Sequence, residues 1–206
     1  MKKYLPQFFL GFVVFAGFVL FSYLVHKDVF TNLDFDVTVK FQDRIPRSLD
    51  DAFSFLSLIA GAEIVGVFLL ILLGFRRKLM GIFALFGFGL FHLFEVYGKT
   101  FVDHFPPPQF MIRTHELVQF PAFHIRLENS YPSGHAGRTA FVSTLIVVWV
   151  LKSKKLSSGT KFIILTLLAG FNIVMFASRI YLGEHWTTDV IGGALLGLAL
   201  GILTAF

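Results

Sequence analysis

The sequence predicts an all-α, polytopic membrane protein whose helices form a single bundle. Of its 206 residues, 55% are hydrophobic and only 15% are charged, and the mean hydropathy is +0.73. Such a composition excludes an ordinary soluble domain. Apolar runs of roughly the 20 residues that a bilayer crossing requires recur between polar links. We therefore expect one domain over residues 1–206, with six transmembrane helices.

The residue content excludes several classes of function. The chain contains no Cys, which excludes disulfides, thiolate metal sites and a cysteine nucleophile. Its formal net charge is +5, but the charged residues lie in loops between hydrophobic segments. Anionic membrane lipid is therefore a better-motivated partner than nucleic acid, and no protein partner is implied.

The first predicted span covers residues 4–25, an uncharged run of suitable length. No small-x-small cleavage site follows it, so we expect a retained span rather than a signal peptide. In the polar loop 27–51, Leu33, Val37 and Phe41 share one helical face, although alternate residues also fit a strand. An interfacial helix is the favoured interpretation beside a membrane.

Five further spans follow from apolar runs that polar links separate: 52–75, 79–97, 134–151, 162–178 and 186–206. The second span is interrupted only by Glu63, which should face the bundle interior. Between the third and fourth spans, the polar loop 99–132 contains three consecutive prolines that forbid a continuous helix. Its apolar residues, Phe110-Met111-Ile112 and Leu117-Val118, predict an interfacial loop or helix that shapes lipid entry.

The distribution of charge predicts the orientation. The N-terminus, the 76–78 turn and the 152–161 link carry nine Lys or Arg residues (2, 3, 76–78, 152, 154, 155 and 161) and no acid. By the positive-inside rule these segments are cytoplasmic. The other loops also carry basic residues, but there acidic residues dilute them. Alternation then brings four helix ends, near residues 99, 134, 179 and 185, to the extracytoplasmic face.

Three side chains near the last of these ends suggest nucleophilic chemistry. His185 and Asp189 are four residues apart, so they share a face if a helix begins near Glu184. The carboxylate would fix the imidazole tautomer and stabilise the ring when it is cationic, which prepares a histidine to attack. Arg179 ends the preceding span, and its planar guanidinium suits phosphate or carboxylate oxygens.

A second candidate group opens the fourth span, within Tyr-Pro-Ser-Gly-His at residues 131–135. The first amides of a helix are unpaired and lie at the positive end of its dipole. The Ser133 hydroxyl and the Gly134 and His135 amides should therefore form an anion-binding seat. Ser133 also fits a helix N-cap, a role compatible with the first. The His135 ring would face His185 across this seat.

Two of these segments resemble signature motifs of the membrane-bound type-2 phosphatidic acid phosphatase family, whose fold is related to that of soluble vanadium haloperoxidases. Ser178-Arg179-(five)-His185-(three)-Asp189 resembles the third motif, and Pro132-Ser133-Gly134-His135 resembles the second. The resemblance covers the chain from about Glu95 to its end. Residues 1–94 match only in the number of spans.

The first motif of that family, Lys-(six)-Arg-Pro or Lys-(four)-Arg-x-Arg-Pro, is incomplete here. Lys99 and the final proline are kept, but His104 and Pro106 stand at the two arginine positions. An absent phosphate-binding arginine would typically cost a few kcal/mol at the transition state. We expect Arg138, three residues after His135 on the same helix face, or Arg113 in the loop to replace it, with Arg138 favoured.

The resemblance implies an integral membrane phosphatase that hydrolyses a lipid phosphate monoester or diphosphate without metal or cofactor. His185 would attack phosphorus to form a phosphohistidine while Asp189 holds its ring, and His135 would protonate the leaving oxygen and then activate water. Charge on the phosphoryl oxygens would be neutralised by Lys99, Arg179, Ser133 and the Gly134 amide, with Arg138 or Arg113. The residues offer no metal motif such as His-Glu-x-x-His.

Other interpretations remain open at this point. The incomplete first motif also suits a non-catalytic lipid-phosphate binder, and Glu63, His92 and Glu95 would suit a transporter. A vanadium peroxidase is disfavoured because those relatives are soluble. For the loop residues Glu184, His104, His115 and His124 we expect solvated polarity, and for Glu95 a structural pairing with Lys99. The glycines at 192, 193, 197 and 201 should serve helix packing.

Overall fold

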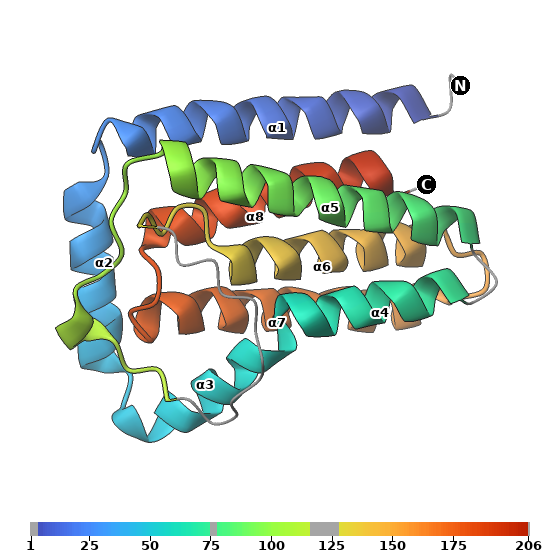
Figure 1. The fold of residues 1–206 in the computed structure, drawn as a ribbon. Coiled ribbons are helices and arrows are strands. Elements are labelled where there is room, and N and C mark those ends of the chain that lie inside the picture. Colours follow the sequence, from blue (N-terminus) through green and yellow to red (C-terminus); the bar gives the residue numbers. More distant parts are fainter. Residues whose placement is uncertain (1–3, 75–77, 116–127, 206) are drawn as a thin grey trace.

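The computed structural model describes residues 4–74, 78–115 and 128–205, without the side chains of residues 63, 72–74 and 78–80. This part of the chain is helical and contains no strand. The α-helices are α1 (Leu5–His26), α2 (Thr31–Arg44), α3 (Asp50–Ile59), α4 (Ala62–Gly74), α5 (Lys78–Phe101), α6 (Gly134–Lys152), α7 (Ser158–Tyr181) and α8 (Thr187–Thr204), with short 3-10 helices η2 (Arg47–Leu49) and η3 (Gln109–Met111). Figure 1 shows the longer helices side by side in one bundle.

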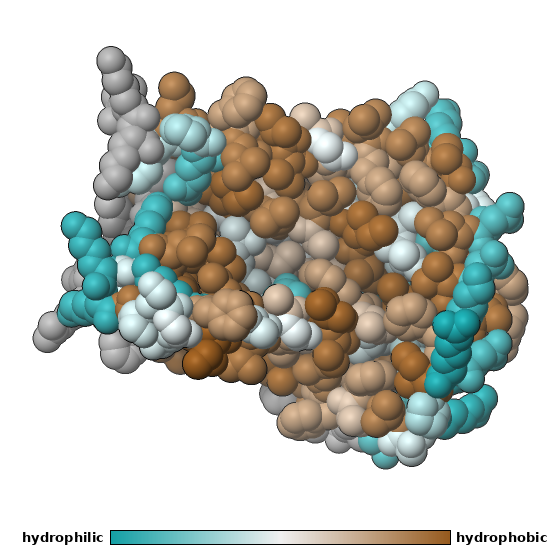
Figure 2. Space-filling view, turned by 180° about the vertical axis from the view of Figure 1, so that it is seen from behind, coloured by the Kyte–Doolittle hydropathy of each residue, from teal (hydrophilic) through white to brown (hydrophobic). Residues whose placement is uncertain are grey.

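Among the described residues, five helices are long and apolar enough to cross a membrane: α1, α5, α6, α7 and α8. The predicted second span is divided into α3 and α4, which are bent by 42°, and the number of crossings reaches six if this pair is one span. The two helices are separated by Ala60 and Gly61, and the glycine weakens an otherwise apolar helix at this point. In Figure 2, an apolar band lies between two hydrophilic ends, as a membrane-spanning bundle requires.

The polar loop after α1 folds as the interfacial helix α2, so the strand alternative for this segment is wrong. Figure 1 shows α2 lying across one end of the bundle. Val37 and Phe41 pack there against a small cluster of buried residues, Ala136, Ile180 and Val190. The predicted interfacial loop 99–132 begins within α5, which continues to Phe101, and beyond α5 its described part contains only the short helix η3. Leu117 and Val118 lie outside the described residues.

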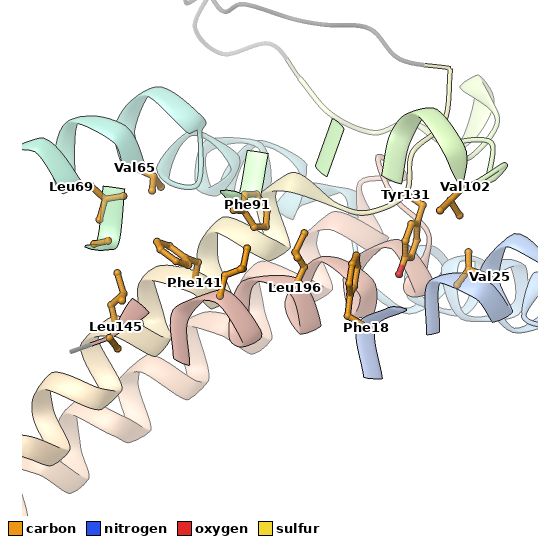
Figure 3. Close-up of a cluster of buried hydrophobic side chains, with 13 residues drawn as sticks. Phe18, Val25, Val65, Leu69, Phe91, Val102, Tyr131, Phe141, Leu145 and Leu196 are labelled. Carbon is orange, nitrogen blue, oxygen red and sulfur yellow. The ribbon is translucent and has the colours of Figure 1, made fainter. Parts of the chain in front are cut away.

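Helices α6 and α8 form the centre of the bundle because glycines let their backbones approach closely. A Cβ atom built on Gly197 would lie 2.1 Å from the Gly137 carbonyl oxygen, and one on Gly193 would lie 2.2 Å from the Ser133 carbonyl oxygen. The predicted packing role of these glycines is thus confirmed. Larger buried side chains fill the remaining space, as Figure 3 shows: Phe18, Val25, Val65, Leu69, Phe91, Val102, Tyr131, Phe141, Leu145 and Leu196.

The helix directions bring four ends together. α5 and α7 end, and α6 and α8 begin, at the end of the bundle that α2 covers (Figure 1). α1 begins and α8 ends at the opposite end, where Gln7 Nε2 donates to the carbonyl oxygens of Ile202 and Ala205 at 2.6 and 2.9 Å. The predicted convergence of four helix ends is therefore present in the fold.

Candidate active site

The turn between α7 and α8 places His185 beside Asp189. Gly183 adopts a φ of 68°, which glycine adopts at no steric cost, and a Cβ atom there would lie 2.3 Å from the Met111 carbonyl oxygen. The Asp189 carboxylate accepts from the Trp186 backbone N–H at 2.9 Å, which orders the start of α8. Its Oδ2 also lies 3.3 Å from His185 Nδ1. The predicted pairing of imidazole and carboxylate is present.

Asp189 contacts a second imidazole that the sequence did not single out. His104 Nδ1 lies 2.9 Å from Asp189 Oδ1, and His104 Nε2 lies 3.5 Å from Oδ2 of Asp34 on α2. Burial alone would lower the pKa of His104, but the hydrogen bonds and negative charges of the two carboxylates outweigh it and raise this pKa to about 9. The expectation that His104 is a solvated loop residue is wrong, because its side chain is only 11% exposed.

The start of α6 joins the same cluster. Ser133 is the N-cap, as expected, and its hydroxyl accepts from the Ala136 N–H at 3.4 Å. The Ser133 N–H donates to the backbone carbonyl of Asp189 at 2.9 Å, so the first turns of α6 and α8 are directly connected. His135 Nε2 lies 3.3 Å from the hydroxyl oxygen of Ser57 on α3. Ser57 has no motif or periodicity that marks it in the sequence.

Arg179 is fully buried and fixed at every nitrogen. Its Nη1 donates to Ser57 Oγ at 2.5 Å and to Glu184 Oε2 at 2.6 Å, while Nη2 donates to the Phe53 carbonyl at 3.1 Å. Nε donates to Ser178 Oγ at 3.2 Å. Glu184 is therefore an ion-pair partner of Arg179, and the expectation of simple loop polarity for it is wrong. Ser57 contacts both Arg179 and the His135 ring.

Three further charged side chains meet at the Gly134 end of α6. Glu95 pairs with Lys99 at 3.0 Å, as expected from their spacing, and also with Arg138 Nη1 at 3.2 Å. Arg138 Nε donates to the Ala60 carbonyl at 2.8 Å. A Cβ atom on Gly134 would lie 2.1 Å from Glu95 Oε1 and 2.7 Å from Arg138 Nη1. Both cations therefore lie against the predicted anion seat, with a carboxylate between them.

His135 is the common point of this arrangement. Arg138, Arg179, His185 and Lys99 all lie close enough to act electrostatically on its ring. Arg113 has other contacts, because its guanidinium carbon lies 5.1 Å from the ring centroid of Tyr181 and its Nη1 donates to the Gln42 carbonyl at 3.1 Å. Of the two predicted replacements for the motif arginine, the fold brings Arg138 to the predicted seat.

The remaining polar candidates lie elsewhere or are not described. His115 pairs with Asp51 at 2.6 Å, and both side chains are mostly exposed. His92 Nδ1 lies 3.3 Å from Glu95 Oε2, which ties the proposed transporter residues to the cationic cluster. The Glu63 side chain and all of His124 lie outside the described residues.

Fold and site together define a polytopic membrane protein in which three imidazoles and several cations meet at one end of the bundle. This class of site is suited to phosphate chemistry. The chain belongs to the PAP2 superfamily, because the model of that family matches residues 78–205. The family predicted from the motifs is thus confirmed, and the match begins earlier than the motifs alone indicated.

Individual relatives agree with this assignment. Phosphatidylglycerophosphatase B of Bacillus subtilis (strain 168) is 30% identical over 129 residues, 63% of this chain and 58% of that protein. YbjG of Escherichia coli (strain K12), named as a candidate undecaprenyl-diphosphatase, is 33% identical over 91 residues, 44% of this chain and 40% of that protein. The matched region thus spans about half the length of these curated relatives.

A solved structure confirms the fold over nearly the whole chain. The crystal structure of a transmembrane PAP2 type phosphatidylglycerolphosphate phosphatase from Bacillus subtilis superposes with a TM-score of 0.76 at 22% identity. The superposition covers 94% of this chain and 93% of that one. Most of the segment before residue 95, which matched the family only in span count, therefore belongs to the same fold.

Proposed function

We propose that this protein is a metal-independent membrane phosphatase that hydrolyses a lipid phosphate monoester or diphosphate. The observation that carries the proposal is the pairing of His185 with Asp189 beside His135. Because Nδ1 of His185 lies 3.3 Å from the carboxylate, Nε2 is the ring nitrogen directed away from it. Two imidazoles at one site, only one of them held by a carboxylate, suit a nucleophile and an acid–base partner.

In the proposed first step, the lone pair of His185 Nε2 forms a bond to phosphorus while the bond from phosphorus to the leaving oxygen breaks. Protonated His135 gives its proton to that oxygen, which leaves as the lipid alcohol or the lipid monophosphate. In the second step, neutral His135 takes a proton from water as the water oxygen bonds to phosphorus. The P–N bond breaks, its electron pair returns to Nε2, and inorganic phosphate is released.

The cations stabilise charge on the phosphoryl oxygens in both steps. Arg179, Lys99 and Arg138 are each paired with a carboxylate of the protein. An entering phosphate must therefore exchange with Glu184 or Glu95 as the anionic partner. The amides of Gly134 and His135, at the start of α6, provide the remaining donors.

We further propose that the site opens on the extracytoplasmic face. The end of the bundle that carries the site holds acidic loops, whereas the opposite end holds the basic link with Lys152, Lys154, Lys155 and Lys161. Labelling of single cysteines, introduced at position 155 and at position 36 of the cysteine-free chain, with a membrane-impermeant reagent tests this orientation. Labelling of position 155 but not of position 36 in intact cells would reverse it.

The names of the relatives support a lipid substrate. The experiment that tests this compares four phosphorylated lipids. Purified protein is incubated with phosphatidic acid, phosphatidylglycerol phosphate, undecaprenyl diphosphate or a lipid A phosphate, with and without a chelator, and released phosphate is measured. We expect turnover of at least one lipid that the chelator does not reduce. His185→Ala should abolish it, with His115→Ala as the matched control. Binding without turnover in the wild type would instead establish a non-catalytic lipid-phosphate binder.

The separate role of His135 is testable through the leaving group. The leaving group of a p-nitrophenyl phosphate ester is p-nitrophenolate, which needs no proton to leave. His135→Ala should therefore still release p-nitrophenolate in a single burst and then accumulate the phosphohistidine. The alkyl ester should show no burst in the same variant. Equal losses with both esters would mean that His135 does not act as the acid.

A further inference from the structure

We propose that His104 is a positioning residue that acts through Asp189 to keep His185 unprotonated and nucleophilic at neutral pH. The inference rests on the proposed function. It adds a fixed cation beside the paired His185 and Asp189. The buried Asp34 and Asp189 and the partly buried His104 and His185 then form one continuous chain of contacts. His104 contacts no reacting atom and keeps its proton throughout.

The geometry assigns the charge of His104. Both of its ring nitrogens face carboxylate oxygens, Nδ1 at 2.9 Å from Asp189 and Nε2 at 3.5 Å from Asp34. A neutral imidazole has only one N–H and would direct a lone pair at one of these oxygens, whereas an imidazolium donates to both. The two carboxylate side chains are at most 3% exposed, so an unpaired charge on either would be costly.

The groups packed around His104 agree with a cation. α2 contributes Asp34, α8 contributes Asp189, and the segment before α6 contributes the Tyr131 ring, edge-on with centroids 6.4 Å apart. None of these three is basic. The raised pKa of His104, about 9, places its protonated form across the neutral range.

Asp34 also ties this chain to the backbone of α8. Its Oδ1 accepts from the Thr188 N–H at 2.8 Å and its Oδ2 accepts from the Thr188 hydroxyl at 2.6 Å. Thr188 immediately precedes Asp189. Through Asp34, α2 therefore fixes the positions of His104 and of the first turn of α8 relative to each other. Asp34 cannot move without disturbing both.

The consequence for His185 follows from the shared carboxylate. Asp189 alone would favour protonated His185, and a protonated ring has no lone pair on Nε2 with which to attack. His104 offsets part of the negative charge on Asp189 through the other oxygen. It therefore lowers the proton affinity of His185 while Asp189 still holds the ring. From α6, His135 lies close enough for the two rings to interact electrostatically.

In the first motif of the family, arginine can stand at two positions, and residue 104 of this chain occupies one of them. Here the side chain is turned toward Asp189 and Asp34. We infer that the cation at this position is retained for a different task, the control of His185, while Arg138 lies at the anion seat.

The test measures the protonation of His185 directly. In ¹⁵N-histidine-labelled protein in detergent, the His185 ring is assigned by its loss in His185→Gln and titrated by NMR. We expect His104→Gln to raise the His185 midpoint measurably, because the negative charge of Asp189 is then no longer offset by a second cation. His104→Arg, which keeps a cation, should leave the midpoint near that of the wild type. His115→Gln is the matched control.

The same variants are then assayed for the pH dependence of kcat/KM with the lipid phosphate that the wild type hydrolyses. The acid limb of His104→Gln should move to higher pH by the same amount as the NMR midpoint. A His185 midpoint that is equal in His104→Gln and in the wild type overturns the inference, whatever the turnover. A wild-type protein that hydrolyses no lipid in the panel overturns the proposed function, while the titration still decides the role of His104.

Discussion

The Glu184 carboxylate lies 2.6 Å from Nη1 of Arg179, so the guanidinium expected to bind phosphate is already paired with an anion of the protein. Glu184 also accepts from the Thr114 hydroxyl at 2.6 Å. The charge of Arg179 is therefore balanced by a carboxylate of the protein, and phosphate must compete with that carboxylate for the same cation.

Replacement of this competitor should tighten phosphate binding. Glu184→Gln keeps a hydrogen-bond acceptor beside Arg179 but removes the negative charge. We expect the inhibition constant of inorganic phosphate to fall about two- to fivefold, the range for a partly exposed ion pair. Steady-state inhibition at constant ionic strength measures it. Weaker phosphate binding in this variant would show that Glu184 is needed to hold Arg179 in place.

Arg138 should supply the positive charge that binds phosphate and that the incomplete first motif lacks. Arg138→Ala is expected to lower kcat/KM by about 10²-fold or more, the usual cost of a lost transition-state donor. Arg113→Ala should lose the contact with the Tyr181 ring, worth about 1 kcal/mol or less, and keep its kcat/KM. Unfolding temperatures separate stability from chemistry in both variants. A large loss of turnover in Arg113→Ala alone would reverse the assignment.

Stability should fall at alkaline pH because of His104. Its pKa is about 9 in the folded protein against 6.5 for an ordinary histidine, so the folded state binds the proton more tightly. This contribution, up to about 3 kcal/mol, is fully present below pH 6.5 and disappears as pH rises through 9. Urea unfolding in mild detergent at pH 6, 8 and 10 measures it. His104→Gln should be less stable at pH 6 and show a flatter dependence.

The contact between α6 and α8 should tolerate no added side chain. In Gly197→Ala the new methyl group would meet the Gly137 carbonyl oxygen at 2.1 Å, and backbone cannot yield as a flexible side chain would. We expect a loss of about 1–3 kcal/mol and reduced turnover, because α6 carries His135 and α8 carries Asp189, which holds His185. Gly170→Ala, on α7 with no atom within 4 Å, is the control. Thermal unfolding that is equal in the two variants would contradict this packing.

Local pattern was sufficient for part of the structure. The helical class, the membrane location and the approximate spans follow from lengths of apolar sequence, and His185 and Asp189 follow from spacing on one helix face. The meeting of residues 99, 133–135 and 179 with this pair follows from alternation of spans. Each of these properties can be predicted from short stretches of the sequence.

The contributions of Asp34 and Ser57 could not be obtained in this way. Asp34 is a polar residue in an interfacial helix, where acids are ordinary, and it is functional only because α2 lies across the bundle. Ser57 lies in an apolar run and meets Arg179 and His135 only because α3 diverges from α4. Similarly, His104 has a loop sequence around it, and only the fold places two carboxylates beside its ring.

The joint at Ala60-Gly61 also determines which atoms of the second span can reach the site. Ser57 lies three residues from it, about 4.5 Å along a helix that rises about 1.5 Å per residue. If α3 continued straight from α4 instead of bending by 42°, the Ser57 position would swing by roughly 3 Å. A hydrogen bond does not survive such a swing. An insertion or a helix-favouring substitution at this glycine would therefore uncouple a whole segment from the chemistry without touching any charged residue.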